Sequence, residues 1–112
     1  MTKTISDENC PIIHALSVID GKWKLPLLWH LADNPCGIRY NELKRRLEGI
    51  TNIMLTRSLR DLEADGVIVR RCFSGASPHV EYTLTAQGQA LIPALSAVKA
   101  WGKQLHHTSA SS

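Results

Sequence analysis

Three cysteines are the most reactive side chains in this sequence, and Cys10 has the most favourable position among them. Cys10 directly precedes Pro11 and an apolar segment, so we expect it at the N-terminus of a helix. The helix dipole and the free N–H groups at such an end stabilise a thiolate, which is the reactive form of cysteine. The sequence therefore predicts a redox or effector site at Cys10. The alternative is an inert thiol that packs as a small hydrophobic group.

The other cysteines and the histidines do not extend this chemistry to a catalytic or metal site. Cys36 and Cys72 are far apart and form no C-x-x-C pair, so neither a zinc ribbon nor a disulfide scaffold is predicted. His14 follows Cys10 by one helical turn, but no orienting group accompanies the pair. The histidines at 106–107 are adjacent rather than three or four residues apart. We expect no enzyme, no metal and no cofactor; a thiol redox enzyme is a minor alternative.

Basic residues are concentrated in the middle of the chain. Residues 39–71 hold eight lysines and arginines against five acidic residues, whereas the remainder holds five of each sign. The whole excess charge of +3 therefore lies in this segment. A surface that faces phosphates requires such a placement. A solvated basic face is the alternative.

Length and composition indicate one globular domain. The chain has 112 residues, of which 44% are hydrophobic and 21% charged. A TIM barrel or a full dinucleotide-binding fold would need a longer chain. The most apolar stretch, Leu25–Ala32, is too short to span a bilayer, and Met1–Asn9 does not resemble a signal segment. We expect a cytoplasmic protein with a flexible segment over 1–9, one domain over 10–105 and a flexible tail over 106–112.

The apolar periodicity predicts a mainly α fold with a small β-hairpin (α+β). Two strands are expected from the alternation in Val67–Phe73 and in Val80–Leu84, joined by the loop Ser74–His79. The final helix contains Pro93, which should produce a kink. The helical segments, bounded by Pro, Thr and Gly signals, are Ile12–Ile19, Lys24–Ala32, Tyr40–Leu47, Thr51–Asp65 and Ala86–Leu105.

The segment Thr51–Asp65 has two different faces. Leu55, Leu59 and Leu62 recur at helical spacing and suit a core, whereas the opposite face is basic. A short helix, a turn, a longer helix and a hairpin form the winged helix-turn-helix arrangement, whose second helix lies in the DNA major groove. Base contacts are expected from that helix, with Ile53 suited to a thymine methyl. The predicted DNA-binding residues are Arg39, Lys44, Arg45, Thr51, Asn52, Ile53, Thr56, Arg57, Arg60 and the loop residues Ser77 and His79.

These motifs together resemble the HxlR-type bacterial transcriptional regulators over about residues 10–105. The matching runs are Cys10-Pro11, Gly21-Lys22-Trp23, Arg39-Tyr40-Asn41-Glu42-Leu43, Gly49-Ile50-Thr51-Asn52, Leu59-Arg60, Asp65-Gly66 and Val80-Glu81-Tyr82. The resemblance implies a winged-helix, DNA-binding homodimer related to the MarR type, acting near its own gene. It also singles out the position of Cys10, through which several members sense oxidants or electrophiles. Ile53 and His79 depart from the pattern, where the family often has lysine and arginine.

A symmetric dimer would bind a pseudo-palindromic operator, because one winged helix contacts only a short half-site. The apolar stripe of the last helix is longer than a small domain can cover alone. Packing of these side chains in the core of one chain is the alternative. The predicted dimer interface comprises Ile12, Ile13, Leu16, Leu91, Leu95, Val98 and Trp101.

The sequence leaves three further alternatives open. The loss of a cation at Ile53 and at His79 also fits a winged-helix protein-interaction module without specific DNA binding. The effector could be an oxidant or a small molecule held between the dimer helices. A disulfide could join Cys10 to Cys10 or to Cys72 of a second chain.

Overall fold

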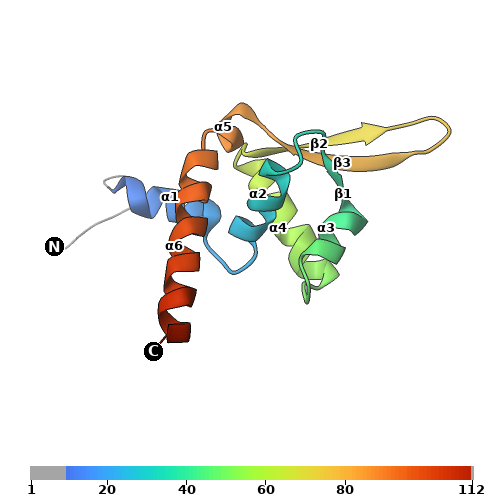
Figure 1. Cartoon of the computed structure of the whole chain (residues 1–112). Helices are drawn as coiled ribbons and strands as arrows, with labels where there is room; N and C mark the ends of the chain where they lie inside the picture. The colour runs from blue at the N-terminus through green and yellow to red at the C-terminus, as the bar shows by residue number, and fades with distance from the viewer. Residues whose placement is uncertain (1–9, 112) are drawn as a thin grey trace.

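The computed structural model describes residues 10–111, with side chains described for residues 10–105. The segment expected to be flexible over 1–9 lies outside the described residues. Helices α1 (Pro11–Ile19), α2 (Lys24–Ala32), α3 (Tyr40–Arg46) and α4 (Asn52–Ala64) occupy the predicted positions to within one residue. Strands β2 (Ile68–Phe73) and β3 (His79–Leu84) form the predicted hairpin, which projects away from the terminal helices in Figure 1. The mainly α, winged architecture is therefore confirmed.

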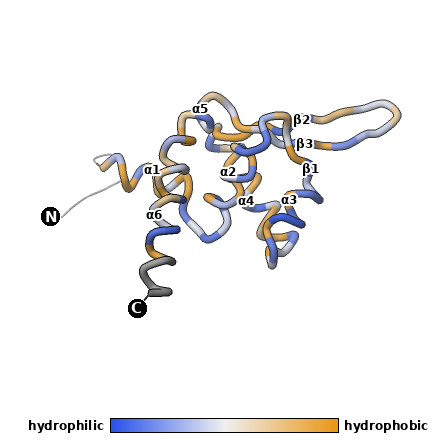
Figure 2. The backbone as a smooth tube through the Cα atoms, in the orientation of Figure 1, coloured by the Kyte–Doolittle hydropathy of each residue, from blue (hydrophilic) through white to orange (hydrophobic). Residues whose placement is uncertain are grey.

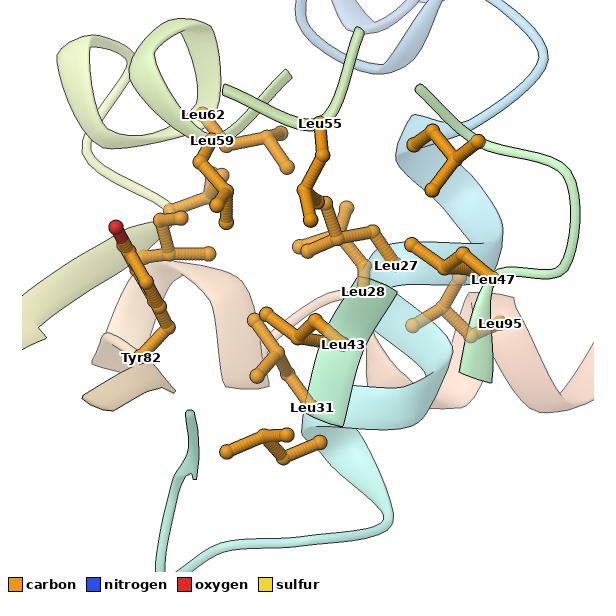
Figure 3. Packing of buried hydrophobic residues seen from close by; sticks show 14 residues of the cluster. Leu27, Leu28, Leu31, Leu43, Leu47, Leu55, Leu59, Leu62, Tyr82 and Leu95 are labelled. Carbon is orange, nitrogen blue, oxygen red and sulfur yellow. The ribbon is translucent and has the colours of Figure 1, made fainter. Parts of the chain in front are cut away.

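The hydrophobic core lies where α2, α3 and α4 meet the base of the sheet. Leu27, Leu28 and Leu31 of α2 are fully or almost fully buried. Leucines from α3 and α4 pack against them, as Figure 3 shows. The predicted leucine face of α4 is thus the inner face, because these side chains leave water only by packing here. Leu55, Leu59 and Leu62 fix the rotation of α4 and turn its opposite face outward.

The sheet contains a strand that the sequence pattern did not predict. Strand β1 (Ile38–Arg39) pairs with β3, so the strand order is β1-β3-β2 and all pairs are antiparallel. Ile38 lies opposite Tyr82, and Arg39 lies opposite Glu81. A strand of two residues carries no readable alternation, so only its pairing reveals it. Because α3 begins at the next residue, β1 ties the helix-turn-helix directly to the wing.

The prediction of one kinked C-terminal helix is wrong. The structure has α5 (Ala86–Gln89) and α6 (Ile92–Ser111), separated by Ala90 and Leu91. Pro93 lies in the first turn of α6, where its missing N–H leaves no hydrogen bond unmade. Proline therefore marks the start of a new helix here. Helix α6 also continues beyond residue 105, where the pattern places its end.

The N-terminal helix α1 has no fully buried side chain, and only its last residues, Val18 and Ile19, pack partly against the core. Its sequence is nevertheless strongly apolar, as the orange segments of α1 in Figure 2 show. Apolar side chains are also exposed on α6, where Val98, Trp101 and Leu105 are each at least 49% exposed. No helix in the described part of the chain is long and apolar enough to cross a membrane.

Candidate nucleic-acid interface

The candidate interface is built on α4, which begins with a side-chain cap. The Thr51 hydroxyl oxygen accepts a hydrogen bond from the Met54 backbone N–H at 3.1 Å. This bond satisfies one of the free N–H groups of the first turn and fixes the helix start. Gly66 follows the C-terminus with φ of +78°, a left-handed conformation that favours glycine, and leads into β2. The predicted start and stop signals are therefore both used.

The outer face of α4 gathers the residues that the sequence predicts for base contacts. Ile53, Arg57 and Arg60 are exposed, and Ile53 is 71% exposed. An open hollow runs along this face; its lining residues are Asn52, Ile53, Thr56, Arg57, Arg60 and Asp61. The face therefore combines amide, hydroxyl, guanidinium and methyl groups on one exposed helix. Helices of this kind fit the major groove and can distinguish base edges there.

Tyr40 connects this face to α3, a role that the pattern analysis did not predict. The Tyr40 hydroxyl lies 3.1 Å from the Thr56 hydroxyl oxygen. It also lies 3.2 Å from the backbone carbonyl oxygen of Asn52 and 3.3 Å from its side-chain oxygen. Tyr40 immediately follows β1, so the sheet places it against the first turns of α4. The only sequence signal was its presence in the Arg39–Leu43 motif.

Two basic side chains of α3, Arg45 and Arg46, form ion pairs with an acidic residue of the same helix. Glu42 accepts hydrogen bonds from Arg45 Nη2 at 2.5 and 2.6 Å and from Arg46 Nε at 2.8 Å. The bonds to Arg45 and then to Arg46 lower the pKa of Glu42 from 4.5 to about 2. The same pair raises the pKa of Arg45. Arg45 is thus exposed but carries a bound counter-charge, while Lys44 is half-buried on the same helix.

The wing holds His79 by three contacts. Its ring stacks on Phe73 with centroids 4.7 Å apart and planes within 13°. Its Nδ1 lies 2.7 Å from the Ser77 carbonyl oxygen, and its Nε2 lies 2.8 Å from Glu81 Oε2. His79 therefore stabilises the wing and its loop, while Ser77 is exposed in that loop. Arg39 is exposed on the neighbouring strand, opposite Glu81.

The base of the wing contacts α4 through residues that the sequence analysis did not select. Arg70 Nε lies 4.0 Å from Glu63 Oε2. Between α4 and the strands is a small hollow, and Arg70 and Tyr82 line it together with Thr56 and Arg60 of the outer face. Burial raises the pKa of Tyr82. Alternation within β2 could have indicated that Arg70 faces α4, because it shares a face with the buried Ile68.

Cys10 occupies the N-cap position of α1, as the sequence predicts, and it is half-buried. Its backbone carbonyl accepts a hydrogen bond from the His14 N–H at 3.0 Å. Cys36 and Cys72 are exposed, and all three cysteines are free thiols in this chain. The position at a helix N-terminus is therefore present, and no bond within the chain blocks the thiol.

The residues selected for a dimer interface fall into two groups. Ile12, Leu16, Val98 and Trp101 are exposed, and Ile13 is half-buried. Leu91 is half-buried against the core, and Leu95 is only 5% exposed within the core. Leu95 leaves almost no surface for a partner because α6 packs on α2 at this point. It belongs to the core of the single chain.

Residues 18–110 match the family described as HxlR-like helix-turn-helix. The chain belongs to this family. It is 44% identical over 96 residues to YybR of Bacillus subtilis (strain 168), an uncharacterized HTH-type transcriptional regulator, covering 86% of this chain and 75% of that protein. The structure of the redox regulator HypR in its oxidized form is similar with a TM-score of 0.79 and 43% identity, over 85% of this chain and 96% of HypR.

The same regulator in its reduced form gives a TM-score of 0.83 with 40% identity, over 92% of this chain and all of that one. This member of the HxlR-like family is thus a DNA-binding transcriptional regulator of the winged helix-turn-helix type. The family and these relatives are regulators, so the expectation that the chain is not an enzyme is confirmed. The resemblance to HxlR-type regulators is confirmed as well.

Proposed function

We propose that two copies of this regulator bind a pseudo-palindromic DNA site, each placing the outer face of α4 in a major groove. The observation that carries the proposal is the anchoring of α4, whose leucines lie in the core while Asn52, Arg57 and Arg60 face outward. In this arrangement α4 reads bases, while the cations of α3 and β1 and the wing residues Ser77 and His79 contact phosphates. Phosphate contacts position the helix, whereas base contacts provide specificity. The site of action is the cytoplasm, where such DNA is accessible.

The experiment compares Arg57→Ala with Arg45→Ala on two DNAs. One DNA is a site selected by the protein itself from a random library, and the other is a scrambled sequence of equal length. An arginine that bonds a base contributes about 1–3 kcal/mol of discrimination, so Arg57→Ala should weaken specific binding roughly 5- to 150-fold and scrambled binding much less. Arg45→Ala should weaken both equally and reduce the salt dependence. Equal losses for Arg57→Ala would reassign this side chain to a phosphate. Failure to select any site would favour the protein-interaction module.

The dimer is supported by apolar surface that one chain leaves uncovered. Helix α1 leaves Ile12 and Leu16 exposed, and α6 exposes Val98 and Trp101. Beside them runs an apolar groove between α2 and α6, to which Pro26 and Trp29 contribute. Monomeric proteins seldom leave a patch of this kind in water. The proposed interface therefore uses α1 and α6, without Leu95.

We also propose that oxidation of Cys10 controls DNA binding. Hydrogen peroxide would oxidise the thiolate to a sulfenic acid and release hydroxide, and a second thiol would then form a disulfide and release water. Cys10 lies at the N-cap of α1 as a free thiol, and the similar protein HypR is described as a redox regulator. DNA affinity should change on peroxide treatment of the wild type and of a Cys36→Ser control. In Cys10→Ser, peroxide should leave the DNA affinity as it was. If this variant responds to peroxide as the wild type does, Cys10 is not the sensor.

A further inference from the structure

The hydrogen bonds of Tyr40 determine which polar atoms α4 can offer to a base. Three oxygen atoms of α4 lie within 3.3 Å of the Tyr40 hydroxyl, and they belong to Asn52 and Thr56. Both residues line the hollow on the outer face of α4. The sequence pattern selected both for base contacts. Tyr40 itself is half-buried behind them, at the first residue of α3.

The number of available protons limits how this cluster can be arranged. A tyrosine hydroxyl and a threonine hydroxyl each carry one proton, whereas the two oxygens of Asn52 can only accept. If Tyr40 donated to Thr56, neither Asn52 oxygen would receive a proton from the cluster. Every contact carries a proton only when Thr56 donates to Tyr40 and Tyr40 shares its single proton between the two Asn52 oxygens. The cluster thereby has a direction, from Thr56 through Tyr40 to Asn52.

We propose that Tyr40 is a specificity-determining positioning residue, because it sets the hydrogen-bonding polarity of the recognition face. The Asn52 side-chain oxygen is held inward by Tyr40, so the amide NH2 group is presented to DNA as a donor. The Thr56 proton is also held inward, so its oxygen is presented as an acceptor. This inference rests on the proposed function of α4 in reading bases.

The polarity predicts the kind of base edge that each residue selects. A donor at Asn52 matches the major-groove acceptors, which are guanine N7 and O6, adenine N7 and thymine O4. An acceptor at Thr56 matches the amino groups of cytosine N4 or adenine N6. The bidentate pairing of asparagine with adenine requires both its oxygen and its nitrogen to reach the base, and here the oxygen is turned toward Tyr40. Asn52 should therefore not select adenine in that way.

The test measures base preference with Tyr40→Phe, which removes only the hydroxyl, against the wild type as the reference. Affinities are measured for the selected DNA site and for every single-base variant of it. One intramolecular hydrogen bond contributes about 0.5–1.5 kcal/mol, so Tyr40→Phe should reduce discrimination at the Asn52 and Thr56 positions roughly 2- to 13-fold. Binding to scrambled DNA should stay the same, whereas the melting temperature should fall slightly because Tyr40 loses its hydrogen bonds to α4. Unaltered discrimination, or an equal loss on all sequences, would overturn the proposal.

A measurement without DNA separates this inference from the proposed function. The side-chain amide of Asn52 should be rigid in the wild type by 15N relaxation, and it should become mobile in Tyr40→Phe. An amide that is equally mobile in both proteins would overturn the positioning role, whatever the DNA experiments show. Conversely, a rigid amide with no DNA discrimination by the wild type would mean that the base-reading function of α4 is wrong.

Discussion

Replacement of Trp101 by alanine should dissociate the proposed dimer. Trp101 is 61% exposed in the single chain. A tryptophan side chain presents about 200 Å² of surface, so about 120 Å² is available for a partner. At about 25 cal/mol per Å², its burial is worth roughly 3 kcal/mol. A two-fold symmetric interface contains the residue twice, so the loss is roughly 6 kcal/mol per dimer, or about 10⁴-fold in the dissociation constant.

Sedimentation equilibrium over a wide range of concentration measures this constant directly. Ile53→Ala is the matched control, because Ile53 is 71% exposed but lies on the proposed DNA face. It should leave the dimer intact. The reasoning is refuted if the wild type is monomeric at micromolar concentration, or if Trp101→Ala and Ile53→Ala weaken the dimer equally.

Two further substitutions test packing and charge. A Cβ at Gly88 would lie 2.1 Å from the Val67 carbonyl oxygen, so Gly88→Ala should lower the free energy of unfolding by about 1–3 kcal/mol in urea denaturation. Gly102→Ala, where a Cβ meets nothing within 4 Å, should leave it unchanged or raise it by up to about 1 kcal/mol; similar losses in both would contradict the contact. Glu42→Gln should release Arg45 and tighten binding to scrambled DNA, measured by anisotropy against salt; weaker binding would contradict this role. Because the pKa of Glu42 is lowered from 4.5 to about 2, its ion pairs stabilise the fold above pH 4.5 and are lost as the pH falls towards 2. An NMR titration of the Glu42 carboxyl group measures this pKa, and a midpoint near 4.5 would disprove the pairing.

The fold was predictable where one helix or strand carries its own signal. Thr51, Gly66 and the leucines of α4 act within a few residues of each other, and the structure uses them as expected. Strand β1 was not predictable, because it depends on pairing with β3, far away in the chain. Ile38 is in a strand only because β3 lies beside it. The break before α6 does carry a local signal, Pro93, but that signal predicted a kink within one helix rather than the start of a second helix.

In the candidate site, too, local sequence signals were predictive and contacts between distant elements were not. The outward direction of Arg57 follows from helical periodicity, since it lies opposite the buried leucines. By contrast, the engagement of His79 with Phe73 and Glu81 requires the paired strands of the wing. The contact of Tyr40 with α4 depends on the turn between two helices. The sequence therefore indicated which residues form the site, but it did not predict their hydrogen-bond partners.

Strand β1 has a consequence for the shape of DNA that this regulator can accept. Its backbone bonds to β3 join the wing to α3 without a linker, since Arg39 ends the strand and Tyr40 begins the helix. The separation between the wing and α4 is therefore a fixed dimension of the protein. A duplex whose grooves differ from that dimension must bend or change its groove width to contact both elements. Because the energy of such deformation depends on sequence, we expect selection at base pairs that no side chain touches.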